Sequence, residues 1–318
     1  MLVFGLGAIG SFYACMISDH ADVYVVARSN YGAVYKDGLQ LKSKRYGNKT
    51  VKFKGVYPSV DDAQINNHPL HFDLIICANK AIVDRPPYLH DIIRPAVGPQ
   101  TCIVIIQNGI GNEEPLVRAF PANHVVGCVT FAGCIIEKPN VVSHFNHETM
   151  AIGWASGKGT RNFRDSMQPL ADMLRETDFT VVSDIKSERW KKVIWNAAWN
   201  TLTTLTPLNT SELLVLPDGL QFCIRVMDKV IEIARADGAT IPDSFALELI
   251  SRVLATGGIY SSMKNDLTNG KEMEVEAILG NVVACGKKNR IDVSLLEGLL
   301  FPLRAIQHGI RNGMYSKI

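Results

Sequence analysis

The chain has 318 residues, of which 47% are apolar and 20% charged, and its net charge at pH 7 is +2. These values fit a soluble globular protein with room for about two domains of ~150 residues. They give no sign of a nucleic-acid or membrane-surface binder. No apolar run approaches the ~18 residues that a membrane span requires, and no secretory signal is expected at the start.

The seven cysteines are scattered along the chain, and no Cys-x-x-Cys spacing occurs. This usage predicts reduced, buried thiols and argues against both a disulfide framework and a zinc site. We therefore expect a cytoplasmic protein that binds no metal, no nucleic acid and no membrane.

The chain opens with MLVFGLGAIG, in which a short apolar strand runs directly into glycines spaced G-x-G-x-x-G. A helix is predicted over residues 8–18, and Asp22–Ala27 predicts a second strand. In a dinucleotide-binding unit, Gly5 would make the tight turn, Gly7 would let the backbone approach a pyrophosphate, and Gly10 would let the helix pack on the strand. An ordinary tight loop is the alternative interpretation.

Arg28 follows the second strand, in the region where an Asp or Glu ordinarily holds the ribose 2′-hydroxyl of NAD. A guanidinium can bind a 2′-phosphate through a fork of hydrogen bonds, whereas a carboxylate would repel it. The sequence therefore favours NADP(H) over NAD(H), unless Arg28 is only a solvated surface residue.

Further apolar runs alternate with helical or loop segments and predict a parallel sheet covered on both faces. The predicted strands are Leu74–Ala78, Cys102–Ile106 and His124–Val129, followed by a hairpin of Val141–Phe145 and Met150–Trp154. The basic segment Gly38–Gly55 is interpreted as a loop.

From about Lys186 the strand signals disappear, and helices are predicted at Glu188–Leu205, Leu220–Gly238, Ser244–Ala255, Gly270–Asn289 and Leu295–Gly309. The predicted fold is α/β, with an N-terminal Rossmann-type parallel-sheet domain and an all-helical C-terminal domain. We assign residues 1–185 to an NADP-binding domain and residues 186–318 to a helical substrate and catalytic domain.

Lys192, Asn196 and Asn200 recur at helical spacing and lie within about 80° of each other around the helix. Aromatic and aliphatic residues surround them, and buried asparagines need polar partners. A partly desolvated lysine has a lowered pKa, and it can donate a proton to a carbonyl oxygen as hydride reaches the carbon. A narrow solvated stripe is the alternative.

Several separated motifs resemble the ketopantoate reductase (2-dehydropantoate 2-reductase) family over nearly the whole chain. They are GLGAIG with Arg28, Lys80 in NKA, QNGIGNEE, WKKVIWNAAWN and SSMKNDLTNGKEMEVEAILGN. The resemblance implies an NADPH-dependent reductase with a Rossmann domain and a helical domain. It implies cofactor binding by Gly5, Leu6, Gly7, Ala8, Ile9, Gly10, Arg28, Lys80 and Asn108.

The resemblance also implies roles at the substrate. Lys192 matches the catalytic proton donor to the keto oxygen, and Glu274 matches a glutamate that accepts a hydrogen bond from the substrate's terminal hydroxyl. Contacts with substrate are implied for Asn108, Asn196, Asn200 and Ser262.

Each role has a simpler alternative. Glu274 could belong to a solvated acidic face, Ser262 could only cap a helix, Lys80 could be a surface charge, and Asn108 could only be a turn residue before Gly109.

The implied reaction reduces ketopantoate to (R)-pantoate on the route to pantothenate and coenzyme A, with hydride passing from the nicotinamide C4 to the 2-keto carbon. Departures from the family pattern, such as Thr201 and Met273, leave the 2-keto acid open. The alternatives are a reductase of another branched 2-oxo acid, such as 2-ketoisovalerate, and a non-catalytic NADP-binding redox sensor. The expected partner is a small-molecule 2-keto acid, and a homodimer is the assembly considered.

Overall fold

The computed structural model describes residues 1–67, 72–156 and 163–314, and the contacts within the chain divide it into two units. Unit 1 consists of Met1–Lys80, Arg85–Gln107 and Asn112–Ile185, and unit 2 consists of Ala81–Asp84, Asn108–Gly111 and Lys186–Ile318. The main division therefore lies between Ile185 and Lys186, but two short segments of the N-terminal half belong to unit 2. The functions assigned to the two domains stay predictions.

Strands and helices alternate in unit 1. In chain order they are β1 (Leu2–Phe4), α1 (Ala8–Ile17), β2 (Tyr24–Val26), α2 (Tyr31–Asp37), β3 (Leu39–Ser43), β4 (Lys49–Val51), β5 (Gly55–Tyr57), α3 (Val60–Asn67), β6 (Leu74–Cys77), α4 (Leu89–Ile93), the 3₁₀ turn η1 (Arg94–Ala96), β7 (Cys102–Ile105), α5 (Glu114–Ala119), β8 (His124–Lys138), β9 (Val141–Ser156), α6 (Phe163–Met173) and β10 (Phe179–Val181).

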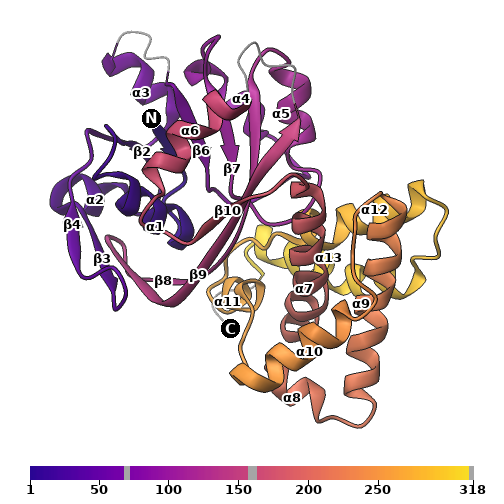
Figure 1. Cartoon of the computed structure of the whole chain (residues 1–318). Coiled ribbons are helices and arrows are strands. Elements are labelled where there is room, and N and C mark those ends of the chain that lie inside the picture. Colours follow the sequence, from indigo (N-terminus) through magenta and orange to yellow (C-terminus); the bar gives the residue numbers. More distant parts are fainter. Residues whose placement is uncertain (68–71, 157–162, 315–318) are drawn as a thin grey trace. The chain divides into compact units, whose positions relative to one another are not determined.

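The strands form one sheet in the order β4-β3-β9-β8-β7-β6-β1-β2-β5, with β10 paired to β9 (Figure 1). Neighbours from β5 through β2, β1, β6 and β7 to β8 are parallel. From β1 the chain moves to β2 on one side and later to β6 on the other, so the strand order reverses at β1. Ligands of open parallel sheets bind beyond the carboxyl ends of the strands at such a reversal.

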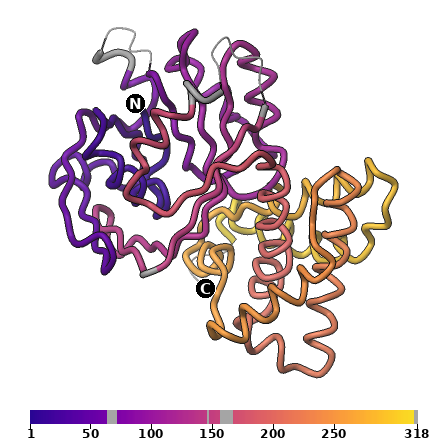
Figure 2. Tube along the Cα trace, in the orientation of Figure 1, coloured from indigo at the N-terminus to yellow at the C-terminus, as the bar shows by residue number. Residues whose placement is uncertain are grey.

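Both faces of the sheet are buried. In β1, Leu2 and Phe4 join one apolar cluster with residues of α3 and α5, while Val3 joins another with residues of α1 and α6. Burial on both faces explains why the central strands β1, β6 and β7 are apolar without alternation. The predicted N-terminal parallel-sheet fold is confirmed; Figure 2 traces its chain path.

The predicted hairpin between Val141–Phe145 and Met150–Trp154 is wrong, because β9 runs through both segments and pairs antiparallel with β8. The polar middle of β9 suggested a turn. Glu148, however, is fully buried, and its carboxylate accepts a hydrogen bond from the Tyr46 hydroxyl at 2.6 Å.

The predicted loop Gly38–Gly55 is also wrong, since it contains β3 and β4, and β3 pairs in parallel with β9. Leu39 and Leu41 are buried on one face of β3, and the basic residues that follow them hid this period of two.

The regular elements of unit 2 are all helical among its described residues, as predicted. Its elements are α7 (Ile185–Leu205), α8 (Thr210–Leu214), α9 (Gly219–Ala236), α10 (Phe245–Thr256), α11 (Ser262–Thr268), the π-helical turn η2 (Glu276–Gly280), α12 (Asn281–Lys288) and α13 (Ser294–Arg311). The predicted helix Gly270–Asn289 is wrong in its first turn, because residues 271–274 have no regular structure. The backbone N–H of Met273 instead donates to the Gln307 side chain at 2.9 Å.

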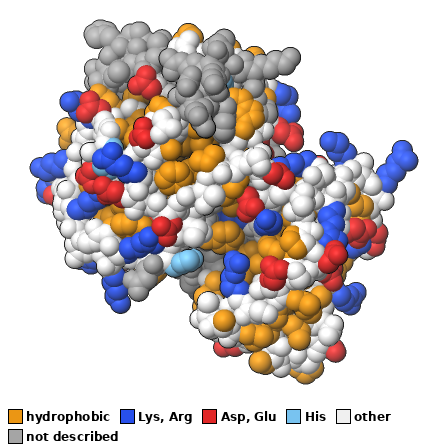
Figure 3. Space-filling view, in the orientation of Figure 1, with side chains coloured by type: hydrophobic (Ala, Val, Ile, Leu, Met, Phe, Trp, Pro, Cys, Tyr) orange, Lys and Arg blue, Asp and Glu red, His pale blue; other side chains and the backbone are white. Residues whose placement is uncertain are grey.

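One apolar core joins the helices of unit 2, with Trp190 and Trp199 of α7 fully buried inside it. Hydrophobic side chains also gather on the surface over α8 and α10, where Leu247 and Leu254 are exposed (Figure 3).

Within the described ranges, no helix combines the length and the apolar character needed to cross a bilayer. The seven cysteines, all of them described, carry free thiols.

Candidate active site

The glycine turn follows β1 at the carboxyl edge of the sheet. Gly5 has φ +99°, and a Cβ on it would lie 2.6 Å from the backbone nitrogen of Asn79. A Cβ on Gly10 would lie 2.0 Å from the carbonyl oxygen of Gly5, whereas a Cβ on Gly7 would meet no atom within 4 Å. Gly5 and Gly10 are therefore required by the turn and by helix packing. Gly7 leaves the backbone open to a ligand.

A buried asparagine holds this turn in shape. The Leu6 carbonyl accepts hydrogen bonds from Asn30 Nδ2 at 2.9 Å and from Ser11 Oγ at 3.3 Å. Asn30 lies just beyond β2 and was missed by the sequence analysis, because nothing in the chain around it marks its side chain as buried. Its hydrogen bond fixes the Leu6–Gly7 peptide.

Helix α1 begins directly after the turn, with Gly7 as its N-cap and with no acidic residue in its first turn. The first N–H groups of a helix have no intrahelical partner, and they carry a partial positive charge. Ala8, Ile9 and Gly10 therefore present donors to an anion. The residues that are present fit the pyrophosphate of a dinucleotide.

Arg28 and Lys80 are exposed residues beyond β2 and β6, the two strands that flank β1. Because the three strands are parallel, both cations follow the same edge of the sheet as the glycine turn. In the described part of the chain, the Arg28 carbonyl accepts the Tyr31 N–H at 3.1 Å, but its guanidinium makes no hydrogen bond or ion pair. Its guanidinium is thus available to a ligand.

In unit 2, α7 carries the predicted polar face. Lys192 is half-buried, and Asn196 and Asn200 are only 5% and 3% exposed. The Nδ2 atoms of both asparagines are buried and have no hydrogen-bond partner among the residues that the structure describes. These amides do not form a solvated stripe, and unpaired buried donors are costly without a polar partner.

Glu274 is buried, with 8% of its surface exposed, and so does not belong to a solvated acidic face. Its Oε1 accepts the backbone N–H of Ala81 at 2.8 Å, and its Oε2 accepts Asn108 Nδ2 at 3.0 Å. Both donors lie in the two short segments that belong to unit 2. The structure therefore brings together Asn108 and Glu274, which are 166 residues apart in the sequence.

Asn108 lies in a turn that is tied to η2 and α12. Gly109 has φ +97°, and a Cβ on it would lie 2.3 Å from the Ala277 carbonyl oxygen. The Ile110 N–H donates to that same oxygen at 3.2 Å, and Asn281 Nδ2 donates to the Ile110 carbonyl at 2.7 Å. Asn108 is thus a turn residue whose side chain is also directed at Glu274.

Burial lowers the pKa of Lys192 to about 8, with Glu274 opposing this shift and Arg189 adding to it. A buried ammonium loses hydration, which favours the neutral amine, while a nearby carboxylate stabilises the charged form. Lys192 can therefore hold and release a proton near neutral pH, as a general acid must.

Ser262 is exposed and is the first residue of α11, and its predicted contact with substrate stays a prediction. The helix cap is Ser261, whose Oγ accepts the Lys264 N–H at 3.1 Å and is 2.8 Å from the Thr203 hydroxyl. Thr203 lies about three turns beyond Lys192 on the same face of α7. The sequence analysis missed both Ser261 and Thr203.

No cluster of three or more His, Cys, Asp and Glu residues that could hold a metal ion occurs in the described part of the chain.

The chain matches known proteins along most of its length. Residues 1–157 match the family model for ketopantoate reductase PanE/ApbA, and residues 184–307 match the model for its C-terminal part. The 2-dehydropantoate 2-reductase of Nostoc is 25% identical over 318 residues, which cover 99% of this chain and 97% of that protein. The crystal structure of 2-dehydropantoate 2-reductase from Methylococcus capsulatus superposes with a TM-score of 0.84 at 28% identity, covering 97% of each chain.

A ternary structure of D-mandelate dehydrogenase with NADH and anilino(oxo)acetate shares the fold, with a TM-score of 0.81 at 19% identity over 98% of this chain and all of that one. The two family models together cover most of the sequence. The chain belongs to the ketopantoate reductase family of NAD(P)-dependent oxidoreductases.

Proposed function

We propose that this protein uses NADPH to reduce 2-dehydropantoate to (R)-pantoate, with Lys192 as the proton donor. The observation that carries the proposal is the α7 face, where a half-buried lysine with its pKa lowered to about 8 is followed by two buried amides. The Nδ2 atoms of these amides lack partners among the described residues. This set of groups suits a 2-keto acid better than it suits a structural role.

The chemistry divides between cofactor and protein. A nicotinamide cofactor supplies the hydride when it is bound. The Lys192 ammonium donates the proton to the keto oxygen, and its charge stabilises the alkoxide that develops there. Hydride and proton together convert the ketone to a secondary alcohol and leave the neutral amine to be reprotonated from solvent.

The remaining polar groups bind the substrate. Asn196 and Asn200 offer donors for the carboxylate and keto group of a 2-keto acid. Each Glu274 oxygen already accepts one hydrogen bond, but a carboxylate has about four lone-pair sites. Glu274 can therefore also accept the terminal hydroxyl of 2-dehydropantoate.

Glu274 also decides between the proposed substrate and the alternative. A branched 2-oxo acid without a hydroxyl, such as 2-ketoisovalerate, offers the Glu274 carboxylate no donor. Its binding would place apolar atoms of the substrate against this carboxylate, which is unfavourable. The non-catalytic sensor is disfavoured because binding alone requires no lysine with a lowered pKa.

The preference for NADPH rests on the end of β2. There the chain offers the exposed Arg28 guanidinium and no carboxylate in the run from Ala27 to Asn30. Such a cation suits a 2′-phosphate, whereas NAD-specific sites ordinarily place an acid in this region.

Lys192→Ala should lower kcat by ~10²–10⁴-fold while NADPH binding is retained, because the proton donor is lost.

In the unmodified protein, kcat/KM for reduction should fall as pH rises through about 8. Reduction requires the ammonium form of Lys192, and this form predominates only below its pKa. The reverse oxidation needs the neutral amine and should rise through the same pH. Steady-state assays of reduction and of oxidation across this pH range measure both dependences. An undiminished kcat in Lys192→Ala would refute the assignment of Lys192 as the proton donor.

Arg28→Ala should weaken NADPH binding by roughly 10–100-fold and leave NADH binding nearly unchanged, since hydrogen bonds to a charged group contribute ~1.5–3 kcal/mol. Fluorescence titration with both cofactors measures this ratio. Arg118→Ala is the matched control, because Arg118 is an exposed arginine of unit 1 whose ion pair is with Glu114. Equal losses for NADPH and NADH would contradict the 2′-phosphate role.

Two alanine substitutions in the glycine turn should have different effects. Gly10→Ala forces a methyl group against the Gly5 carbonyl and should destabilise the protein by roughly 1–3 kcal/mol, which thermal denaturation measures. Gly7→Ala meets no protein atom, so the melting temperature should stay nearly unchanged while cofactor affinity falls. Unaltered cofactor affinity in Gly7→Ala would argue against a phosphate at this turn.

Glu274→Ala should lower kcat/KM for 2-dehydropantoate by roughly 10–100-fold more than for 2-ketoisovalerate, given that a lost hydrogen bond at a buried polar group costs ~1–3 kcal/mol. Glu297→Gln, at an exposed glutamate of α13 that pairs with Lys287, is the control. If both substrates lose equally, Glu274 does not recognise the hydroxyl.

A further inference from the structure

We propose that Arg311 is a positioning residue that fixes the Glu274 carboxylate without touching it. This inference rests on the proposed role of Glu274 in binding substrate. It assigns a specificity function to the end of α13.

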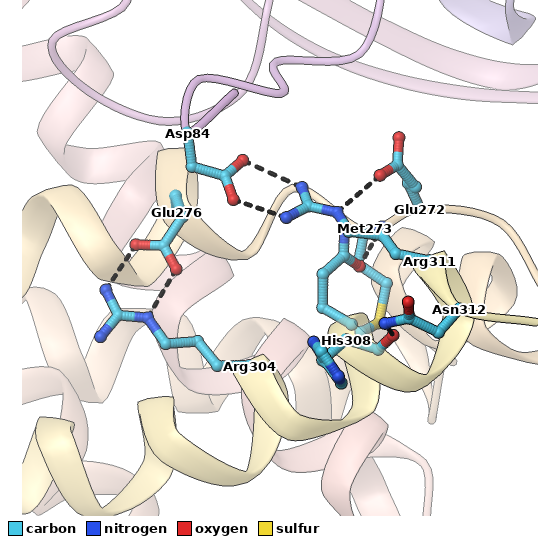
Figure 4. Close-up of polar contacts among 9 residues, drawn as sticks. Asp84, Glu272, Met273, Glu276, Arg304, His308, Arg311 and Asn312 are labelled. Carbon is cyan, nitrogen blue, oxygen red and sulfur yellow. Dashed lines mark hydrogen bonds and ion pairs between the residues drawn. The ribbon is translucent and has the colours of Figure 1, made fainter. Parts of the chain in front are cut away.

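Arg311 is the last residue of α13, and its guanidinium joins two carboxylates from distant parts of the chain (Figure 4). Its terminal nitrogens donate to both oxygens of Asp84 at 2.7 and 3.0 Å, and its Nε donates to Glu272 Oε1 at 2.7 Å. All three side chains are partly covered, with exposures of 24% for Arg311, 31% for Asp84 and 25% for Glu272. The carboxylates raise the pKa of Arg311 well above its usual value, so the clamp stays charged.

We call the contact of Arg311 with Asp84 and Glu272 the clamp. One of its carboxylates is close along the chain to Glu274 itself, and the other is close to a donor of Glu274. Glu272 is two residues before Glu274. Asp84 is three residues after Ala81, whose N–H donates to Glu274 Oε1 at 2.8 Å. Arg311 therefore connects the segment that carries the carboxylate to the segment that supplies one of its donors.

The clamp matters because residues 271–274 have no regular secondary structure, and Glu274 joins the following helical turn only through its carbonyl, which accepts the Ile278 N–H at 3.1 Å. One turn before Arg311 on α13, Gln307 accepts the Met273 N–H at 2.9 Å. Consecutive turns of α13 thus hold Glu272 by its side chain and Met273 by its backbone. With this segment irregular, the position of Glu274 depends on contacts of this kind.

The same helix provides a control pair. Arg304 donates to both oxygens of Glu276 at 2.6 Å, again as a bidentate pair (Figure 4). Glu276, however, begins the π-helical turn η2 and follows Glu274, and the hydrogen bonds of the Arg304 guanidinium go to Glu276, with Asp84 adding only a charge interaction. Removing Arg304 should remove one surface ion pair, which contributes little to stability, and should leave Glu274 in place.

The experiment is a double-mutant cycle of Arg311→Ala and Glu274→Ala, with kcat and KM measured for 2-dehydropantoate and 2-ketoisovalerate. Arg311→Ala should lower kcat/KM for 2-dehydropantoate by about 10–100-fold, as small displacements of a binding group do. It should change kcat/KM for 2-ketoisovalerate by no more than a few fold. In the Glu274→Ala background it should have no further effect, because its action passes through that carboxylate.

Asp84→Asn keeps the size of the side chain, and it should repeat the selective loss even if Arg311→Ala folds poorly. Arg304→Ala should match the unmodified protein for both substrates. Equal losses for both substrates, or the same loss in both backgrounds, would overturn the positioning role alone. If Glu274→Ala itself retains full kcat/KM for 2-dehydropantoate, the proposed role of Glu274 fails and this inference fails with it.

Discussion

One buried carboxyl group, that of Glu274, joins distant chain segments of the helical unit. Removing a carboxylate from water is costly unless donors replace the lost hydration, and Glu274 obtains them from the Ala81 N–H and the Asn108 side chain. Neither donor belongs to the C-terminal half of the sequence, yet both belong to unit 2 by their contacts. Each is also held by a second interaction, through Asp84 for one segment and through Gly109 and Ile110 for the other. The hydrogen bonds to Glu274 are thus among the contacts that join the chain segments following β6 and β7 to unit 2.

The same carboxylate influences the lysine that would perform the chemistry. Burial alone favours the neutral amine, and Glu274 limits that effect, so the pKa of Lys192 falls from 10.5 only to about 8. At pH 7 an amine with this pKa is mostly protonated, yet it gives up its proton at a cost of about 1.4 kcal/mol. An amine with the ordinary pKa would require about 5 kcal/mol. In the proposed mechanism Glu274 would therefore have two effects, since it would hold the substrate hydroxyl and it raises the pKa of Lys192.

The parts of the fold that could be predicted from sequence are those with local signals. The first strand, the glycine turn and α1 lie within one continuous stretch, and the long helices show their own periodicity over several turns. The errors lie where partners are distant in sequence. β3 is a strand because it pairs with β9, and the start of the predicted helix at Gly270 is irregular because Gln307 takes the Met273 N–H. No pattern within Gly38–Gly55 or residues 270–274 reveals those partners.

The candidate site divides in the same way. Lys192, Asn196 and Asn200 could be recognised as one face because helical spacing is visible in the sequence, and Glu274 and Asn108 were identified through a family resemblance. Asn30, Thr203 and Arg311 escaped both approaches. A residue that contacts substrate is constrained in chemical type by the atoms it must bind. A residue that positions such a substrate-contacting side chain is constrained only by geometry. Several side chains on different elements could meet this geometric requirement. Residues of this second kind therefore leave no pattern in a single sequence, and they are found only when the tertiary contacts are known.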